Sequence, residues 1–573
     1  MAKRATRPKS ENAAITLSFD LLELPTSQHK AGLAGLVLLI QSLPDKDAAP
    51  KIEDLTPTSA RIRFTKDSLQ ALFDDLYDAR IVEVESASKW QGQSPKGEKV
   101  VEETDPKNGR VRTRKSYLYD VVQPAGRFLY ENLADNCDAW HKLWRDMLWA
   151  IPRGKPTTRT PFNERADGKP CAEGGKMWRE LEAFDKARSE NRLRTCEIAG
   201  AILLGAQAVN AEGVAFQGRS DQTLLLHFWQ ITALTFVPQA VDQDGQGEFA
   251  GYVLAIPEVA DLIEFTRLFP RMLRQLSEKR YGYRPAGAVV DLPEQGALEF
   301  FRNLGRLSAQ RVAGKEVSRY ATNAVEFFQM AKLGNNVKTM ASGRVVLENG
   351  LIEQYDAVLA VYRNPLFRSA VVLALLQGEP WYLPMGDALM KRPWQFFVKC
   401  DETPRGLSWF SADAAAKFKR VFENDQLEKE ESSMNPEEVR VRDGAKLGAS
   451  LESIVYRVVQ NFVRRKTEEK SGCRYEDFKD KTFTDEKTGK TRMAVPEPYS
   501  AAKQKICSGA FLAFRSRRDS DFVDYFTSTI GQVAQFLPPE DYRVLAEALL
   551  RTEGPLNRDD VKTLAMLAIS AAS

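Results

Sequence analysis

The chain of 573 residues is long enough to form two or more domains with sizeable cores. Its apolar content of 43% and charged content of 28% are typical of an ordinary soluble globular protein. The net charge is only +3, which excludes a protein that is basic throughout, so any nucleic-acid surface must consist of local clusters.

The N-terminus and the cysteines both favour a cytoplasmic protein. The first ten residues are basic, but no apolar core follows before Leu33, so we expect no signal peptide. The six cysteines form no CxxC pair, and we expect reduced thiols rather than disulfides or a zinc site.

The N-terminal domain is predicted to be organised around one strand and the helix that follows it. Ala14–Asp20 partly alternates apolar and polar residues, as a half-buried strand does. Thr26 and Ser27 can then cap a helix that begins near Gln28. This helix is almost entirely apolar from Leu33 to Ile40, which predicts a core position. It is far shorter than the ~20 residues needed to cross a membrane, and no membrane association is expected.

A strand at Ala60–Phe64 and a helix at Ser68–Tyr77 precede a predicted hairpin with strands at Ile81–Val84 and Val111–Val122. A long polar excursion separates the two strands and ends at Asn108–Gly109, a strong turn dipeptide. Because side chains alternate along a strand, arginines at 110, 112 and 114 would share one face. The candidate nucleic-acid contacts here are Gln91, Gln93, Lys96, Lys99, Asn108, Arg110, Arg112, Arg114 and Lys115.

A helix near Leu133–Ile151 leads into a loop, Ile151–Pro170, that is rich in Pro, Gly and Thr. Basic residues outnumber the two acids of this loop, Glu164 and Asp167. Its candidate phosphate contacts are Arg153, Lys155, Arg159, Arg165 and Lys169.

Strands at Tyr252–Ile256 and Gly287–Leu292 are predicted to alternate with helices near Val259–Lys279 and Gln295–Leu307, and two buried helices follow within Leu351–Leu376. After about Trp409 the patterns are helical. The predicted fold class is therefore α+β, with a large mixed N-terminal domain (1–408), a linker (409–433) and an all-α helical bundle (434–573). Basic candidates in the bundle are Arg464, Arg465, Lys466, Lys503, Lys505, Arg515, Arg517 and Arg518.

Any one of these basic clusters can be read as an ordinary solvated surface. Their repetition in two N-terminal loops and in the bundle favours nucleic acid, because phosphate contacts dominate its affinity for proteins. Tyr117, Tyr119 and Phe162 lie among the N-terminal clusters and are candidates for stacking on bases.

The sequence offers little for catalysis, and we expect no enzymatic activity, no cofactor and no metal. His29, His141 and His227 are scattered, and no HExxH, His–Asp doublet or Cys/His cluster is present. Gly489-Lys490-Thr491 imitates the end of a P-loop without its upstream glycine, and Asp485-Glu486-Lys487 lacks a partner carboxylate. His29, just inside a helix start, is expected to cap or pack.

Three segments resemble a known family. LPTSQHKAGLAGL, which begins at Leu24, resembles the N-terminal signature of the large subunit of type I CRISPR surveillance complexes (Cascade), in the branch near subtypes I-A and I-B. IPRGKPTTRTPFNERA at 151–166 and GNNVK at 334–338 are similar to the same family. The resemblance therefore rests on short motifs spread over most of the chain.

The resemblance implies a non-catalytic subunit at the foot of the guide RNA that reads the protospacer-adjacent motif (PAM) of duplex DNA, nucleates the R-loop and holds the displaced strand. Gln and Asn at the hairpin tip suit adenine, Arg and Lys suit guanine, and Trp90 is a candidate wedge. Two alternatives remain open: a divergent metal-dependent nuclease, and an RNA-binding scaffold without a DNA role. The implied partners are guide RNA, target double-stranded DNA, the backbone and handle-binding subunits, a small subunit, and a recruited helicase–nuclease or transposition factor.

A second protein is also predicted from the same gene. Glu428-Lys429-Glu430-Glu431 must be encoded by a purine tract, which with G in the third positions contains the bacterial ribosome-binding sequence AAGGAGG, two codons ahead of Met434. Asn435 and Pro436 suit a helix start. The resemblance implies that the small subunit is made in this way from residues 434–573. The alternative is an acidic linker that happens to precede a methionine.

Overall fold

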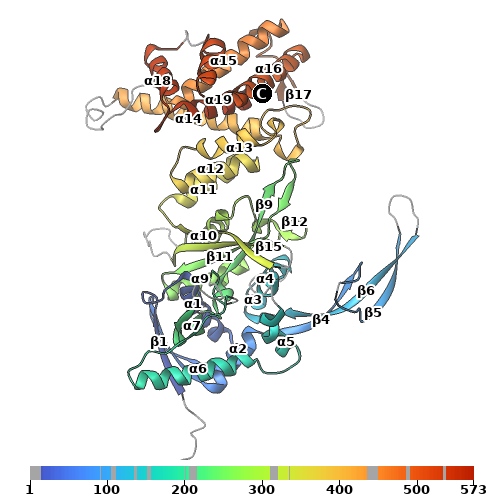
Figure 1. Cartoon of the computed structure of the whole chain (residues 1–573), viewed down its shortest axis with the longest axis vertical. Coiled ribbons are helices and arrows are strands. Elements are labelled where there is room, and N and C mark those ends of the chain that lie inside the picture. Colours follow the sequence, from blue (N-terminus) through green and yellow to red (C-terminus); the bar gives the residue numbers. More distant parts are fainter. Residues whose placement is uncertain are drawn as a thin grey trace, which may run out of the picture. The chain divides into compact units, whose positions relative to one another are not determined.

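The computed structural model describes residues 14–90, 92–104, 111–133, 138–150, 156–200, 202–205, 216–309, 321–333, 336–434, 449–484, 491–532 and 537–573. The chain divides into two compact units (Figure 1). Unit 1 consists of Met1–Pro238 and Phe249–Asn349, and unit 2 of Gln239–Glu248 and Gly350–Ser573. The predicted α+β class is confirmed, since long strands lie in unit 1 and unit 2 is mostly helical.

The first elements of unit 1 form where their local sequence signals predict them. β1 (Ala14–Asp20) pairs antiparallel with β3 (Ser59–Thr65), which also pairs with β2 (Lys51–Leu55). The helix α1 (Ser27–Ser42) begins after Thr26, whose hydroxyl accepts the backbone N–H of His29 at 3.4 Å. The same hydroxyl lies 2.8 Å from Nδ1 of His29, so His29 caps and packs, as predicted.

Two glycines let α1 approach the helices α7 (Ser220–Leu225) and α8 (Trp229–Thr232) at backbone distance. A Cβ at Gly32 would lie 2.1 Å from the carbonyl oxygen of Leu225, and one at Gly35 would lie 2.2 Å from that of Phe228. Only glycine fits at these two positions, so the apolar helix is buried by direct contact with other backbone.

The central sheet has the strand order β10-β9-β11-β15-β16, and β14 pairs with β9. Most of it belongs to unit 1, whereas Gln239–Glu248, the end of β9 and the start of β10, is assigned to unit 2. Val253–Ile256 of β11 are fully buried, so both faces of this strand are covered, and both α1 and α10 contact it. The strands β9, β15 and β16 are absent from the prediction, and the predicted strand Gly287–Leu292 is reduced to β14. The bounds are β9 Leu234–Val241, β10 Gly247–Phe249, β11 Tyr252–Val259, β14 Val289–Val290, β15 Thr322–Leu333, β16 Asn336–Val346 and α10 Glu294–Ala309.

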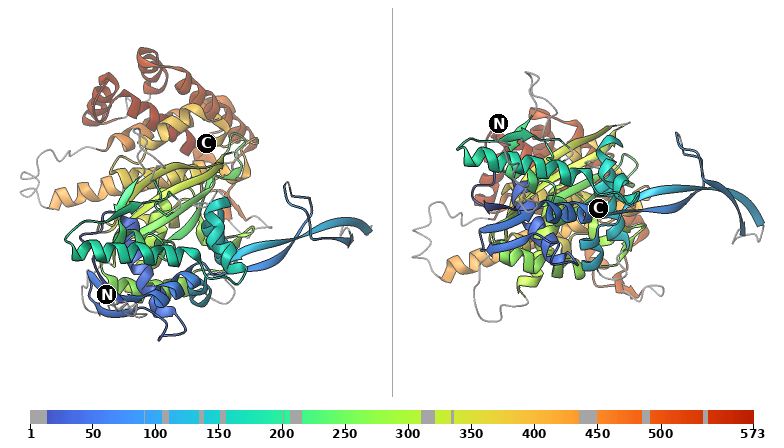
Figure 2. Two further views of the ribbon diagram at one scale, coloured as in Figure 1. Left: turned by 60° about the horizontal axis from the view of Figure 1, so that its bottom comes forward. Right: turned by 90° about the horizontal axis from the view of Figure 1, so that it is seen from below.

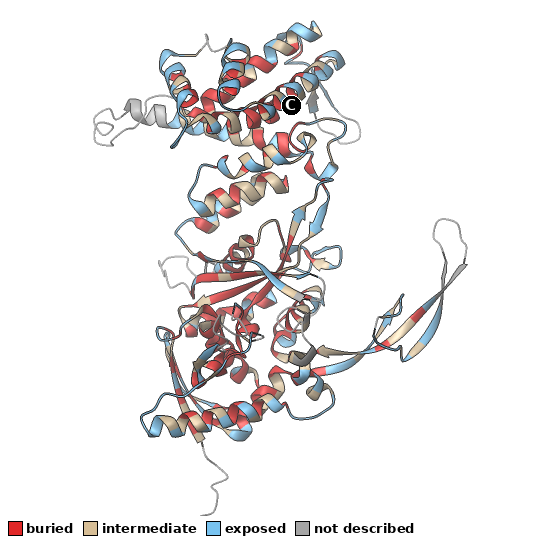
Figure 3. Ribbon diagram, viewed as in Figure 1, coloured by how far each residue is buried: buried red, intermediate tan, exposed pale blue. Residues whose placement is uncertain are grey.

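Smaller elements surround the central sheet, and buried residues gather where the helices meet it (Figure 3). The described helices and strands of this group are α2 Lys66–Leu76, α3 Arg127–Asn132, α4 Asp138–Ala150, α5 Thr160–Ala166, α6 Ala172–Ser189, β7 Thr195–Glu197, β8 Gln217–Arg219, α9 Leu262–Arg274, β12 Arg280–Tyr281 and β13 Arg284–Pro285.

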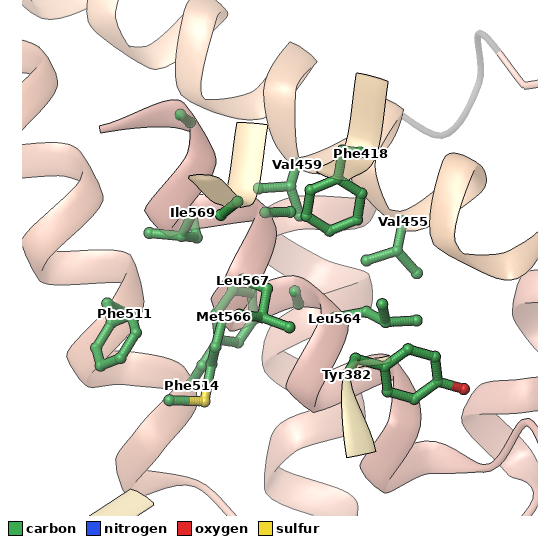
Figure 4. Close-up of a cluster of buried hydrophobic side chains, with 14 of the residues drawn as sticks. Tyr382, Phe418, Val455, Val459, Phe511, Phe514, Leu564, Met566, Leu567 and Ile569 are labelled. Carbon is green, nitrogen blue, oxygen red and sulfur yellow. The ribbon is translucent and has the colours of Figure 1, made fainter. Parts of the chain in front are cut away.

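Unit 2 is arranged around its last helix, α19. Six consecutive residues of α19, Leu564–Ile569, are buried, so the helix is apolar on every side and has neighbours all round (Figure 4). The helices α14, α15, α16 and α18 pack against it. The bounds are α11 Leu351–Val361, α12 Pro365–Gln377, α13 Gly386–Lys391, α14 Phe410–Met434, α15 Leu451–Ser471, β17 Thr482–Thr484, β18 Thr491–Met493, α16 Glu497–Ser516, α17 Asp519–Tyr525, α18 Pro539–Leu550 and α19 Arg558–Ala572.

The predicted linker, residues 409–433, differs from what the structure contains, because nearly all of it belongs to α14. Phe418 of α14 is fully buried and stacks on Tyr456 of α15 with ring centroids 4.5 Å apart. Unit 2 also begins near Gly350 rather than after 408, since residues such as Tyr382 belong to its core. None of the described helices is both long and apolar enough to cross a membrane.

Candidate nucleic-acid interface

The predicted hairpin is a three-stranded arm in the order β4-β6-β5, made of β4 (Ala79–Ser86), β5 (Gly97–Thr104) and β6 (Val111–Pro124). The excursion predicted as polar loop therefore contains a strand, because the long β6 offers backbone partners on both edges. At its base the arm contacts α4 and α5. Beyond the base it stands away from the rest of unit 1 in all three views (Figures 1 and 2).

An aromatic pair stiffens the described part of the arm. The rings of Trp90 and Tyr119 stack with centroids 4.2 Å apart and planes 9° from parallel. The Tyr119 hydroxyl accepts the backbone N–H of Trp90 at 2.8 Å. Tyr119 is fully buried, so its proposed stacking on bases is wrong; it supports the loop that holds Trp90.

The described lysines of the arm are exposed, but each has a carboxylate partner. Lys96 lies 2.9 Å from Asp120, and this hydrogen bond raises the pKa of Lys96. Lys99 lies 3.8 Å from Glu85, and Lys115 lies 3.8 Å from Glu98. Because water and salt screen exposed ion pairs, such partners hold the lysines only loosely in place.

The structure describes only some of the other nucleic-acid contacts predicted in the arm. Gln93 donates from Nε2 to the carbonyl of Asp120 at 3.5 Å. Arg112 and Arg114 lie in β6, where their backbones pair with Glu103 and Val101 of β5. Gln91, Asn108 and Arg110 lie outside the described residues.

The predicted basic loop 151–170 is largely helical from Pro156 onward, with a 3₁₀ turn (Pro156–Arg159) followed by α5. Arg165 donates to the carbonyls of Asp74 at 3.2 Å and Lys169 at 2.9 Å, so it ties α5 to α2 rather than facing solvent. Arg153 and Lys155 lie outside the described residues.

The remaining side chains of this segment are also engaged. The Arg159 guanidinium lies 4.8 Å from the ring centroid of Trp149, and burial lowers its pKa. Lys169 pairs with Asp167 at 3.1 Å. Phe162 is only 1% exposed and packs edge-on against Tyr77, so the expectation that it stacks on bases is wrong.

In unit 2, the basic cluster at the end of α15 is balanced by acids. Arg464 donates to Glu476 at 2.6 Å and to Glu468 at 3.4 Å, and the first of these bonds raises its pKa. Lys466 pairs with Glu469 at 2.9 Å, whereas Arg465 is exposed. The cluster thus presents less positive charge than its sequence suggests.

The basic residues of α16 do not form one cluster with each other. Lys503 and Arg515 are twelve residues apart, about 18 Å along the helix axis. Burial lowers the pKa of Lys503, and Arg515 donates to the carbonyl of Arg392 at 2.7 Å. Arg517 donates to the carbonyl of Ala513 at 2.9 Å, while Lys505 and Arg518 are exposed.

In the part of the chain that the structure describes, no group of three or more His, Cys, Asp or Glu side chains could hold a metal ion. The five described cysteines are free, and burial raises the pKa of Cys171 and Cys507 to about 12, which keeps both thiols protonated. Residues 485–490, including Asp485 and Glu486, lie outside the described part of the chain.

The chain is similar to known protein families over most of its length. Two family models match consecutive parts of the chain, and both describe proteins of type I-B CRISPR systems. The Cas8b N-terminal domain matches residues 49–314, and the Cas8b C-terminal domain matches residues 322–572. The chain therefore belongs to the type I-B Cas8b family of CRISPR large subunits. A search of curated proteins gave no match. The family predicted from the short motifs is thus confirmed, with subtype I-B.

Proposed function

We propose that this large subunit is non-catalytic and recognises the PAM in duplex DNA within an RNA-guided surveillance complex, where it nucleates the R-loop and holds the displaced strand. It acts there with guide RNA, the backbone and handle-binding subunits, the small subunit and a recruited helicase–nuclease or transposition factor. The observation that carries this proposal is the arm, a narrow sheet with exposed polar and basic side chains. In the outer part of the arm β6 pairs with β5 alone, and a two-stranded β-ribbon fits the major groove of B-DNA, which is about 12 Å wide.

The pairing of Lys96 with Asp120 predicts opposite changes in DNA affinity when the lysine and when the aspartate is replaced. If phosphates meet the arm, Lys96 exchanges its carboxylate partner for a phosphate, and Asp120 then repels the same phosphate. Lys96→Gln should weaken complex–DNA binding, whereas Asp120→Asn should strengthen it. If the pair serves only the fold of the arm, both changes should leave DNA affinity unaltered.

The experiment uses the assembled complex with duplex probes that carry or lack the PAM, at several salt concentrations. Each lost phosphate contact should lower the salt slope by about 0.9, so a Lys96→Gln/Lys99→Gln variant should lose about 1.8. Lys391→Gln is the matched control, because Lys391 is also exposed and pairs with a carboxylate, Asp387, at 2.7 Å. Unchanged affinity and slope in the arm variants would remove the arm from the DNA footprint.

The two alternative functions give different results in the same assays. A metal-dependent nuclease would cleave the probes when the purified chain is incubated with Mg²⁺ or Mn²⁺. An RNA-binding scaffold would retain guide RNA yet show no difference between probes with and without the PAM.

We also propose that residues 434–573 exist as a separate small subunit that starts at Met434. In the full chain Met434 is the last residue of α14, so a protein that starts there lacks this helix. Phe418 and Phe422 of α14 pack on Tyr456, which the shorter protein would leave uncovered until it assembles. Mass spectrometry of the purified complex should find a fragment beginning at Met434, and it should disappear in Met434→Leu. If no such fragment appears when the unmodified gene is expressed, this proposal is wrong.

A further inference from the structure

A second surface of unit 1 presents exposed tyrosines beside basic residues. The short strands β12 and β13 form a hairpin with Gly282 and Tyr283 at its turn. Gly282 has a φ of +62°, in the left-handed region that favours glycine. Tyr281 and Tyr283 flank it with 53% and 61% of their surface exposed, although a tyrosine ring normally buries much of its area.

The guanidinium of Arg284 holds the ring of Tyr283 and the neighbouring ring of Phe249. This group lies 4.4 Å from the ring centroid of Phe249 and 5.0 Å from that of Tyr283, and it donates to the Tyr283 hydroxyl at 3.0 Å. Tyr281 meets Phe249 edge-on at 6.3 Å. Cation–π contacts hold Tyr283 and an edge-on aromatic contact holds Tyr281 before any ligand arrives, so ordering these rings on binding costs little conformational entropy.

Helix α4 supplies more positive charge next to the hairpin, and it contacts β13. Nζ of Lys142 lies 5.1 Å from the ring centroid of Tyr283. Arg280 is half exposed, and Asp138, whose side chain is 85% exposed, lies 4.0 Å away from it. Farther along the same helix burial lowers the pKa of Arg145, and repulsion by Arg80 lowers it further.

One acid of α4, Asp146, is engaged by a neighbouring tyrosine. Asp146 accepts a hydrogen bond from the Tyr252 hydroxyl at 3.4 Å, and burial raises the pKa of Asp146. A third exposed tyrosine, Tyr130, borders α4 and rests on His141 with ring centroids 5.1 Å apart. The surface therefore combines preorganised rings with an excess of cations.

We propose that the tyrosine patch, defined as Lys142, Arg280, Tyr281, Tyr283 and Arg284, binds an unpaired segment of nucleic acid. Tyr281 and Tyr283 stack on its bases, and Lys142 and Arg280 contact its phosphates. An unpaired strand is the matching ligand because it exposes the faces of its bases, which a duplex keeps stacked inside. The inference does not depend on PAM recognition by the arm, whose three strands share no residue with the patch.

The test measures binding of the full chain to labelled single-stranded DNA, single-stranded RNA and duplex DNA of one length by fluorescence anisotropy. Loss of stacking on one base should weaken single-strand binding by about 5- to 150-fold in Tyr281→Ala or Tyr283→Ala. Tyr→Phe at either position keeps the ring and should stay within about twofold. Arg280→Ala should lower the salt slope for a single strand by about 0.7.

The controls separate the possible ligands. Tyr542 of α18 is 56% exposed, and Tyr542→Ala should bind all three probes as the unmodified chain does. A larger loss with RNA identifies the guide, and a larger loss with DNA identifies a target strand; either outcome supports the patch. Unchanged single-strand affinity in Tyr281→Ala/Tyr283→Ala overturns the proposal. If that variant keeps its affinity but loses another subunit from the complex, the patch is a protein interface and the proposal is wrong.

Discussion

The contact between α1 and the helices α7 and α8 predicts a large effect from one added methyl group. In Gly32→Ala the new Cβ would lie 2.1 Å from the carbonyl oxygen of Leu225, where an ordinary contact begins at 3.4 Å. The obstructing atom belongs to the backbone, so no change of rotamer relieves the overlap. The two elements must instead move apart by about 1 Å.

Moving the helices apart costs folding free energy, because it leaves a void between them. A separation of about 1 Å over about 150 Å² of helix contact leaves a void of about 150 Å³, which costs roughly 3–4 kcal/mol at about 24 cal/mol per Å³. Alanine returns about 1 kcal/mol through its better helix propensity. The net expectation is a loss of about 2–3 kcal/mol in the free energy of unfolding of unit 1.

Hydrogen exchange of the full chain, read by mass spectrometry, resolves this effect within unit 1. Amides of α1 should exchange roughly 30- to 150-fold faster in Gly32→Ala under conditions where opening precedes exchange. Gly175→Ala in α6 is the control, because no atom lies within 4 Å of its new Cβ, and it should stabilise by up to about 1 kcal/mol. If α1 exchanges as slowly in Gly32→Ala as in Gly175→Ala, the close approach of the two backbones is refuted.

Three further expectations concern two titrating groups and one packing contact. Burial raises the pKa of Asp75 to about 6, so the charged carboxylate destabilises the fold above that pH. Asp75→Asn should raise the free energy of unfolding at pH 8 by about 3 kcal/mol, and this gain should vanish as the pH falls toward 4. Burial lowers the pKa of His29 to about 4, so folding stability that is present above pH 6.5 is lost as the pH falls from 6.5 to 4. His29→Gln should reduce this loss in acid unfolding curves. An unchanged curve would show that protonation of His29 does not cause it. Phe418→Ala should destabilise unit 2 by about 3–5 kcal/mol, whereas Leu427→Ala, 58% exposed on the same helix, should have almost no effect in thermal unfolding.

Features that depend on neighbouring residues were predictable from the sequence. Alternation along Ala14–Asp20 and the hydroxyl of Thr26 place β1 and the start of α1, because strand faces and helix caps are decided within a few residues. Asn364–Pro365 likewise divides α11 from α12, since Asn364 caps the second helix with its side chain at 3.0 Å from the N–H of Phe367. The family resemblance also rests on short local segments.

Strands that depend on distant partners were not predictable in the same way. β15 lacks a clean alternation because β11 and β16 pair with its two edges and its residues are buried on both faces. β5 is too polar to be recognised alone, and it forms because β6 presents a free edge whose paired residues lie 7 to 21 positions farther along the chain.

The character of the candidate interface was decided by tertiary structure as well. The sequence shows where Arg and Lys are concentrated, but it does not show that Arg165 reaches the backbone of Asp74 or that Lys99 pairs with Glu85. Conversely, Tyr281 and Tyr283 resemble ordinary core aromatics until the fold leaves them exposed and brings Phe249 to Arg284. Charge and aromaticity are properties of single residues, whereas pairing and exposure are set by contacts between segments that only the folded chain brings together.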